Sequence, residues 1–290
     1  MQSTILINGL LPYDSGKTYF ALALAKALMN RGVKVLIYKP VAGHSAWYQF
    51  KTVINSLKYG ILVGEDVVKY KEILGLQANL ELLNPIDFLL APLNPKLLKE
   101  VKEYLSLIGD QLSQMILIRI SNCQNGLTQH FIIEHSERRI VPGLKPWIEK
   151  LIKKLKPEPI SLKEVLSIMY SPDTSKLLDQ ALQLIRDKSE VVIVESFNDA
   201  AIPYYNLLNK VDLVFTVAPG YVFKLRTDDF KTIVESYYLR YSDIGLTMSK
   251  LIDEVRIVSE LPLPPVSSVH ELSIYIKGKI RYLMKSLLSR

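Results

Sequence analysis

Short apolar runs and longer amphipathic segments alternate at the start of the chain. Residues 3–8 (STILIN) and 33–39 (VKVLIYK) are apolar runs of the kind found in buried strands. Between them, residues 18–31 are rich in Ala, Leu and Lys and stop at Gly32, a pattern typical of a helix that ends at a glycine. A strand, a helix and a strand in this order predict a βαβ unit, with parallel strands and a right-handed crossover.

The same alternation returns in the second half of the chain. Residues 190–195 (EVVIVE) and 211–217 (VDLVFTV) read as two more buried strands, and residues 174–188 and 227–240 read as helices. Alternating strands and helices favour an α/β fold. We therefore expect a doubly wound, mostly parallel sheet in a three-layer arrangement.

The middle of the chain has a different pattern. Residues 115–121 (MILIRIS) and 129–135 (QHFIIEH) flank Asn125-Gly126, a turn signal that predicts an antiparallel hairpin. Helical patterns follow over residues 146–156 and 161–169, separated by the break Lys156-Pro157-Glu158-Pro159. The sequence thus predicts one domain from residues 1–95 and 173–290, with residues 96–172 inserted as a small α+β element.

Composition limits the class of protein. Of 290 residues, 49% are hydrophobic and 22% are charged, which fits a globular chain with a sizeable core. No apolar run reaches the roughly 18 residues that a membrane span needs, and the first apolar run is too short for a secretory leader. Cys123 is the only cysteine, which excludes an internal disulfide. We expect a cytoplasmic protein without membrane contacts.

The net charge of +7 would suit a polyanionic partner, but most basic residues are scattered. They gather only near the C-terminus, interleaved with apolar residues as on an amphipathic helix with a solvated basic face. This pattern argues against nucleic-acid binding. The basic residues concerned are Lys277, Lys279, Arg281, Lys285 and Arg290.

The most informative stretch is residues 6–18, LINGLLPYDSGKT, which joins the first strand to the first helix. Backbone amides at a helix start, aided by the helix dipole, suit a phosphate. Gly16 permits close approach, Lys17 can reach terminal phosphates and Thr18 can bind Mg²⁺. The standard motif G-x-x-x-x-G-K-[ST] has four residues between its glycines, whereas six separate Gly9 from Gly16, and we expect the upstream glycine to serve turn geometry. The alternative is a helix-starting turn without a ligand. The predicted nucleotide-binding residues of this loop are Asp14, Ser15, Gly16, Lys17, Thr18 and Tyr19.

Several segments in order give the chain a family resemblance. After Gly16-Lys17-Thr18 come residues 39–42 (KPVA), residues 84–92 (NPIDFLLAP) and Val194-Glu195 with Pro203 beyond it. Together they resemble dethiobiotin synthetase over about residues 1–95 and 185–265. The resemblance implies a Mg²⁺-dependent P-loop ATPase, so residues 1–95 and 173–290 would form its nucleotide-binding domain.

The resemblance also suggests roles for residues outside the loop. The metal ligands would be Thr18, Glu195 and Asp66, which stands 18 residues before Asn84 as the family's metal-binding aspartate does. Lys17 and Lys39 would be catalytic, with Lys39 near the γ-phosphate and the acceptor. Each role has a plainer alternative: Glu195 as a solvated strand end, Asp66 as a helix N-cap and Lys39 as a surface lysine.

The base and the acceptor are less well specified. Residues 260–264 (ELPLP) are similar to the family's loop beside the base, which makes Pro262 a base-side residue. The resemblance favours ATP and leaves GTP open. Residues 39–44 read KPVAGH where the family has K-P-V-A-S-G, and residues 194–199 read VESFND where it has V-E-G-A-G-G. These segments line the family's acceptor side, so the small-molecule acceptor is not identified.

Three functions compete at this point. The first is an ATPase that transfers the γ-phosphoryl group of ATP to a small acceptor, as a ligase does. The second is a regulatory or assembly NTPase that acts on a protein partner. The third is a non-catalytic protein with a decayed loop. The sequence leaves open whether the chain forms a homodimer and whether His44 or Cys123 is functional, although a lone His without a partner favours a loop residue.

Overall fold

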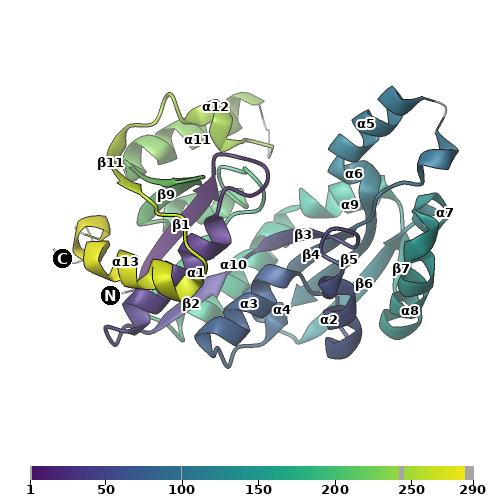
Figure 1. The fold of residues 1–290 in the computed structure, drawn as a ribbon, viewed down its shortest axis with the longest axis horizontal. Helices are drawn as coiled ribbons and strands as arrows, with labels where there is room; N and C mark the ends of the chain where they lie inside the picture. The colour runs from purple at the N-terminus through teal and green to yellow at the C-terminus, as the bar shows by residue number, and fades with distance from the viewer. Residues whose placement is uncertain (1, 99, 242–244, 285–290) are drawn as a thin grey trace. The chain divides into compact units, whose positions relative to one another are not determined.

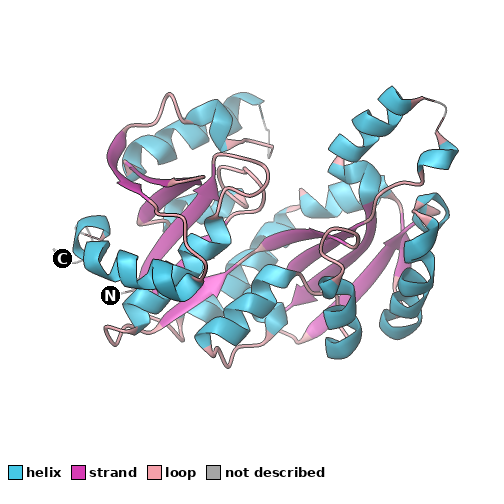
Figure 2. Ribbon diagram, in the orientation of Figure 1, coloured by secondary structure: helices cyan, strands magenta, loops and turns pink. Residues whose placement is uncertain are grey.

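The computed structural model describes residues 2–98, 100–241 and 245–284. Two compact units divide the chain, and each has a β-sheet of its own (Figure 1). The first unit comprises Met1–Pro40, Tyr70–Ala78 and Leu178–Arg290, and the second comprises Val41–Lys69 and Asn79–Leu177. Helices accompany the sheet in both units, so the expected α/β class is confirmed (Figure 2).

The sheet of the first unit has the order β11-β10-β9-β1-β8-β2. Neighbours among β9, β1, β8 and β2 pair in parallel, whereas β10 pairs antiparallel with both β9 and β11. The sheet is therefore mixed and mostly parallel. Its strands are β1 (Ser3–Gly9), β2 (Val35–Tyr38), β8 (Val191–Glu195), β9 (Leu213–Ala218), β10 (Tyr221–Leu225) and β11 (Ile257–Pro262).

The four strands predicted for this sheet all occur in it, but their order differs from a simple βαβ pair. β8 lies between β1 and β2 and pairs with both, so the two strands of the predicted unit are parallel without being neighbours. The reason is that β8, Val-Val-Ile-Val-Glu, is buried along its whole length and needs a neighbour on either side. The parallel strands bring Gly9, Tyr38 and Glu195 to one edge of the sheet.

Helices cover this sheet because they bury their apolar residues in the core of the unit. α1 (Lys17–Met29) is buried almost all round, since it lies between the strands and α13 (Val269–Leu283). Phe20 of α1 meets Phe215 of β9 edge to face, with ring centroids 5.6 Å apart. The remaining helices with residues in this unit are the end of α3 (Glu65–Leu74), most of α10 (Pro172–Arg186), η3 (Tyr205–Lys210), α11 (Thr227–Tyr241) and α12 (Met248–Leu251).

The sheet of the second unit has the order β3-β4-β5-β6-β7. β3 and β4 pair in parallel, as do β6 and β7, whereas β5 is antiparallel to β4 and to β6. The β5–β6 pair is the hairpin that the Asn-Gly turn predicts, so this prediction is confirmed. The strands are β3 (Val41–Ser45), β4 (Ile86–Leu90), β5 (Met115–Asn122), β6 (Leu127–Ile133) and β7 (Glu158–Ile160).

Short helices surround this second sheet, and α2 and α8 contribute Val53, Ile148 and Leu151 to its apolar core. A capping box of Ser161 and Glu164 begins α9. The helices are α2 (Lys51–Tyr59), α4 (Leu80–Leu83), η1 (Pro95–Leu97), α5 (Val101–Gly109), α6 (Gln111–Gln114), α7 (Ser136–Arg139), η2 (Pro142–Leu144), α8 (Lys145–Leu155) and α9 (Leu162–Met169). α3 (Glu65–Leu74) has residues in both units.

The second unit is larger than the insertion expected at residues 96–172. It begins at Val41, because β3 and β4 join the sheet of the hairpin instead of the sheet of the first unit. Across β4 and β5, Phe88 lies opposite Ile118 and Asp87 opposite Arg119. In the structure, therefore, the second unit starts at Val41, whereas the sequence places the start of the insertion at residue 96.

The C-terminal charge pattern agrees with an amphipathic helix as far as the structure extends. On α13, Lys277, Lys279 and Arg281 are exposed, while Ile276 and Ile280 are buried. Lys285 and Arg290 of the same predicted pattern lie outside the described residues. Among the helices of the described ranges, none combines the length and the apolar character of a membrane span.

Candidate functional site

The loop between β1 and α1 approaches the helix through two left-handed residues. Asp14 has φ 52° and Gly16, the N-cap of α1, has φ 89°. A glycine N-cap has no side chain to accept from the first-turn amides, and the first turn, Lys17-Thr18-Tyr19-Phe20, contains a cation and no carboxylate. This helix start therefore suits an anion.

Lys17 folds back over the end of β1 instead of extending into solvent. Its side chain is buried, and Nζ donates to Ser15 Oγ at 3.0 Å. A Cβ atom placed on Gly9 would lie 2.4 Å from Ser15 Oγ and 2.7 Å from Lys17 Nζ. Gly9 is not among the residues with positive φ. The expectation that the upstream glycine serves turn geometry is therefore wrong, because its role is to leave room for the lysine.

Glu195 accepts hydrogen bonds from three polar side chains of this unit. Its Oε1 accepts from Thr18 Oγ1 at 2.8 Å and from Lys39 Nζ at 2.9 Å, and its Oε2 accepts from the Tyr70 hydroxyl. The alignment follows from the sheet, since Ile7 lies opposite Glu195 and Lys39 follows the last residue of β2 at the same edge.

The charged side chains of this cluster, Lys39 and Glu195, are buried. The Glu195 and Lys39 side chains are 1% and 8% exposed, so neither is a solvated strand-end or surface residue. A buried carboxylate is tolerated when a cation and hydrogen-bond donors compensate it, and Lys39, Thr18 and Tyr70 supply both. The carboxylate and the threonine hydroxyl are hard oxygen donors of the type that Mg²⁺ prefers.

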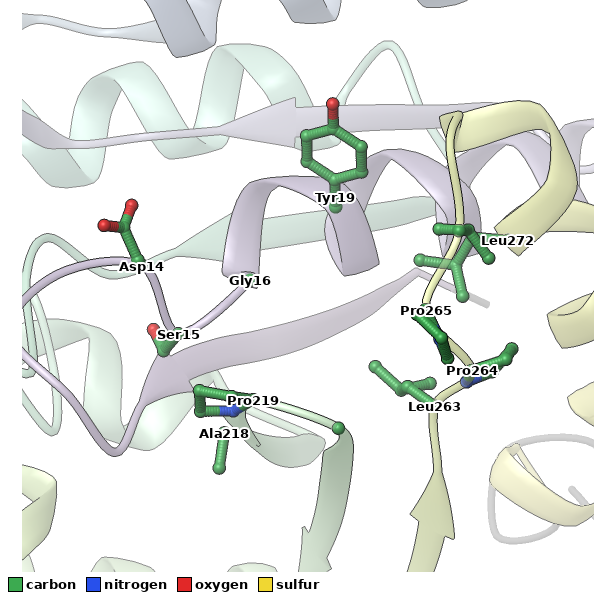
Figure 3. A pocket seen from close by; sticks show the side chains of 12 residues that line it. Asp14, Ser15, Gly16, Tyr19, Ala218, Pro219, Leu263, Pro264, Pro265 and Leu272 are labelled. Atoms are coloured by element: carbon green, nitrogen blue, oxygen red, sulfur yellow. The ribbon is translucent and has the colours of Figure 1, made fainter.

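A pocket of about 270 Å³ opens beside the loop in the same unit. Figure 3 shows Asp14 and Ser15 on the loop side and Leu263, Pro264 and Pro265 on the opposite side. Ala218, Pro219 and Gly220, which join β9 to β10, contribute a third wall, and Tyr19, Val266 and Leu272 also line the pocket. Most of this lining is apolar, with backbone groups and one carboxylate, that of Asp14, beside it.

Pro262, the predicted base-side residue, stands next to this pocket without lining it. It is the exposed last residue of β11 and lies opposite Tyr221, and its carbonyl accepts from the Tyr275 hydroxyl at 2.8 Å. The four residues that follow it form the wall instead.

Asp66, the third predicted metal ligand, lies at the start of α3. It belongs to the second unit and is half-buried in the first turn of α3, after Glu65, so it is a first-turn residue of the helix and not its N-cap. Within the described ranges, no group of three or more His, Cys, Asp or Glu side chains is arranged to hold a metal ion. The role of Asp66 as a metal ligand stays a prediction.

Tyr70 is the residue of the cluster that the sequence does not reveal. It lies on α3 and is fully buried, and its spacing with Val67 and Leu74 is that of an ordinary apolar helix face. A tyrosine on such a face predicts packing, and only the carboxylate beside its hydroxyl indicates another role.

The second unit contains a separate buried polar cluster. His44 lies on β3, not in a loop as expected, and contacts Thr52 Oγ1 at 2.7 Å and Asp87 Oδ2 at 3.2 Å. Arg119 is fully buried and donates to the carbonyl oxygens of Leu62 and Asn84 at 2.7 Å, and burial lowers its pKa. One oxygen of this cluster, Asp87 Oδ1, is buried without a hydrogen-bond partner. Buried polar networks help to fix a core, and this one has no exposed side chain for a substrate to reach.

Cys123 lies at the hairpin end and is half-buried. Its thiol donates to the Glu81 carbonyl at 3.3 Å, and burial raises the pKa of the thiol to about 11. A thiol with that pKa is protonated at neutral pH, which is unsuited to nucleophilic catalysis.

No protein-family model matches the sequence, and no match is found among curated proteins.

Proposed function

We propose that the first unit is a P-loop nucleotide-binding domain that binds ATP with Mg²⁺ and transfers the γ-phosphoryl group to a small acceptor. The observation that carries the proposal is the hydrogen bond of 2.8 Å between Thr18 at the start of α1 and Glu195 at the end of β8. It joins two oxygen donors of the kind that a metal-nucleotide site needs, and Lys17 directly precedes Thr18 in the sequence.

The phosphates would lie against the start of α1. The amides around Ser15–Thr18 and the positive end of the helix dipole attract negative charge, and Gly16 allows the backbone to approach. Lys17 would exchange its contact with Ser15 for the β- and γ-phosphates. The six-residue spacing between Gly9 and Gly16 is compatible with this, because Gly9 serves by leaving space for Lys17.

The oxygen donors fit magnesium, which would neutralise charge on the phosphates when bound. Thr18 and Glu195 of the first unit would hold it. The carboxylate already accepts hydrogen bonds from Thr18, Lys39 and Tyr70, which hold it in a defined orientation.

Lys39 is the second candidate catalytic residue. Its ammonium group lies 2.9 Å from Glu195 Oε1 and is buried, so it has a defined position at the edge of the sheet. A cation held there would stabilise the charge that develops on the transferred phosphoryl group. The pocket lined by Pro219, Leu263 and Pro264 would take the base, and its backbone groups would contact the polar edge of the base.

The test is calorimetric titration of ATP in the presence of Mg²⁺. Lys17→Ala removes a charged contact to phosphate worth about 1.5–3 kcal/mol, so we expect affinity to fall roughly 10- to 150-fold. Lys26→Ala, in the last turn of the same helix, is the matched control and should bind as the wild type does. Equal binding by wild type and Lys17→Ala, or no binding by either, would contradict the proposal.

A regulatory or assembly NTPase is the second candidate function, and the size of the second unit favours it. That unit has its own five-stranded sheet and its own apolar core, which is more than a loop over an active site requires. Slow basal hydrolysis that rises with a protein partner and is unchanged by metabolite mixtures would favour this function over phosphoryl transfer to a small acceptor.

A further inference from the structure

Tyr70 directs its hydroxyl at a carboxylate in the interior of the first unit. Both Tyr70 and Glu195 are 0% exposed, and the phenol donates to Glu195 Oε2. The other fully buried tyrosine of this unit, Tyr38, donates instead to the backbone carbonyl of Leu178 at 2.9 Å. Packing explains a contact like that of Tyr38, but the contact of Tyr70 acts on a charged group of the proposed site.

The two oxygens of Glu195 have different partners. Oε1 accepts from Thr18 and Lys39, whereas Oε2 accepts from Tyr70. A carboxylate at the end of a flexible Glu side chain turns readily about its last torsion, which is broad. A donor on Oε2 therefore fixes the torsion, and with it the direction of Oε1.

We propose that Tyr70 is a positioning residue that keeps Glu195 Oε1 aimed at the Thr18 hydroxyl, so that Mg²⁺ bound with the nucleotide meets an oriented oxygen pair. The inference rests on the proposed nucleotide function of this unit. It adds a residue that supports a metal ligand from behind, as outer hydrogen-bond partners do at other metal sites.

The role can be separated from simple packing because it concerns the metal and not the phosphates. Tyr70 does not belong to the loop of residues 10–16 or to the first turn of α1, so removing its hydroxyl should leave metal-free nucleotide binding unchanged. A merely structural role would weaken nucleotide binding with and without Mg²⁺ alike.

The experiment is a Mg²⁺ titration of the full chain with a non-hydrolysable ATP analogue, followed by calorimetry. For Tyr70→Phe we expect the apparent Mg²⁺ affinity to fall about tenfold, the lower end for outer partners of metal ligands. Affinity for the analogue in EDTA should stay within about twofold of the wild type. Tyr237→Phe is the matched control, because Tyr237 also donates to a carboxylate, Glu254 Oε1, at 2.6 Å, and it should behave as the wild type.

A double-variant cycle strengthens the test. Once Glu195→Gln has removed the carboxylate, adding Tyr70→Phe should change the Mg²⁺ dependence no further. Tyr70→Met removes the donor and fills the space with a flexible apolar chain, and it replaces the phenylalanine variant if that variant does not fold.

The outcomes separate the two proposals. If the wild type fails to bind the analogue with Mg²⁺, the nucleotide function fails and the role of Tyr70 falls with it. If the wild type binds but Tyr70→Phe keeps the wild-type Mg²⁺ dependence, or loses metal-free binding to the same degree, the positioning role is overturned while the nucleotide function stands.

Discussion

Thr18 and Glu195 stand 177 positions apart in the chain and meet through a hydrogen bond of 2.8 Å from Oγ1 to Oε1. The contact exists because α1 starts, and β8 ends, at the same edge of a parallel sheet. Parallel strands flanked by helices bring strand ends and helix starts together in this way, and α/β proteins bind ligands at such edges. The hydrogen bond is therefore a product of the topology.

The Thr18 hydroxyl can be tested by a pair of substitutions. Thr18→Ala removes one of the two oxygens proposed for Mg²⁺, so the apparent Mg²⁺ affinity in the presence of nucleotide should fall about tenfold or more. Thr18→Ser keeps the hydroxyl and should stay within a few-fold of the wild type. Calorimetric Mg²⁺ titration checks both variants, and equal losses in the two would show that the hydroxyl has no part in metal binding.

Gly9 offers a test of the path that Lys17 takes. A methyl group at this position would overlap Ser15 Oγ and Lys17 Nζ, which are ends of side chains that can move aside. Gly9→Ala should therefore weaken ATP binding by displacing the lysine and change the free energy of unfolding by no more than about 1 kcal/mol. Gly278→Ala on α13 is the control, since a Cβ there meets nothing within 4 Å. That change should be neutral or stabilise by up to about 1 kcal/mol. Urea unfolding measures the stability of both variants and calorimetry their ATP affinity, and a wild-type ATP affinity in Gly9→Ala would contradict the steric explanation.

How far the sequence predicts this site depends on the range of each interaction. Lys17, Thr18 and Glu195 could be selected because each stands at an element boundary that a local pattern marks. Tyr70 could not, because a tyrosine on an apolar helix face has the same pattern whether it packs or holds a carboxylate. The space requirement at Gly9 likewise appears only when the lysine is placed in three dimensions.

In the second unit, too, the sequence predicts local structure but not pairing between distant segments. The Asn125-Gly126 turn predicts the β5–β6 hairpin from adjacent residues, and the structure confirms it. β3, with the sequence VAGHS, has too few apolar residues for a strand pattern and is stabilised by pairing with β4. Pairing between distant segments is set by tertiary packing, so the boundary at Val41 was not predictable from local pattern.

The ion pair of Lys39 and Glu195 should show energetic coupling. Lys39→Met removes the positive charge facing a buried carboxylate, and Glu195→Gln removes the negative charge facing a buried ammonium group. We expect each single change to cost about 3 kcal/mol of the free energy of unfolding. The double variant should cost clearly less than the sum, because no lone charge is then left at the contact. Strict additivity in urea unfolding would mean that the pair contributes no coupling.

His130 should make stability depend on pH in the mildly acidic range. Its Nε2 accepts from the Leu62 amide at 3.1 Å, and burial, together with the nearby Arg119 charge, lowers the pKa of His130 to about 4. The unfolded chain then binds a proton that the folded chain does not, so stability is full above about pH 6.5 and falls as the pH drops towards 4. Because His130 is only partly buried, solvent screening limits the loss to the order of 1 kcal/mol. His130→Gln keeps an acceptor for the amide without titrating, so its free energy of unfolding should fall less steeply between pH 6.5 and 4.5, and parallel curves for the two proteins would refute the assignment.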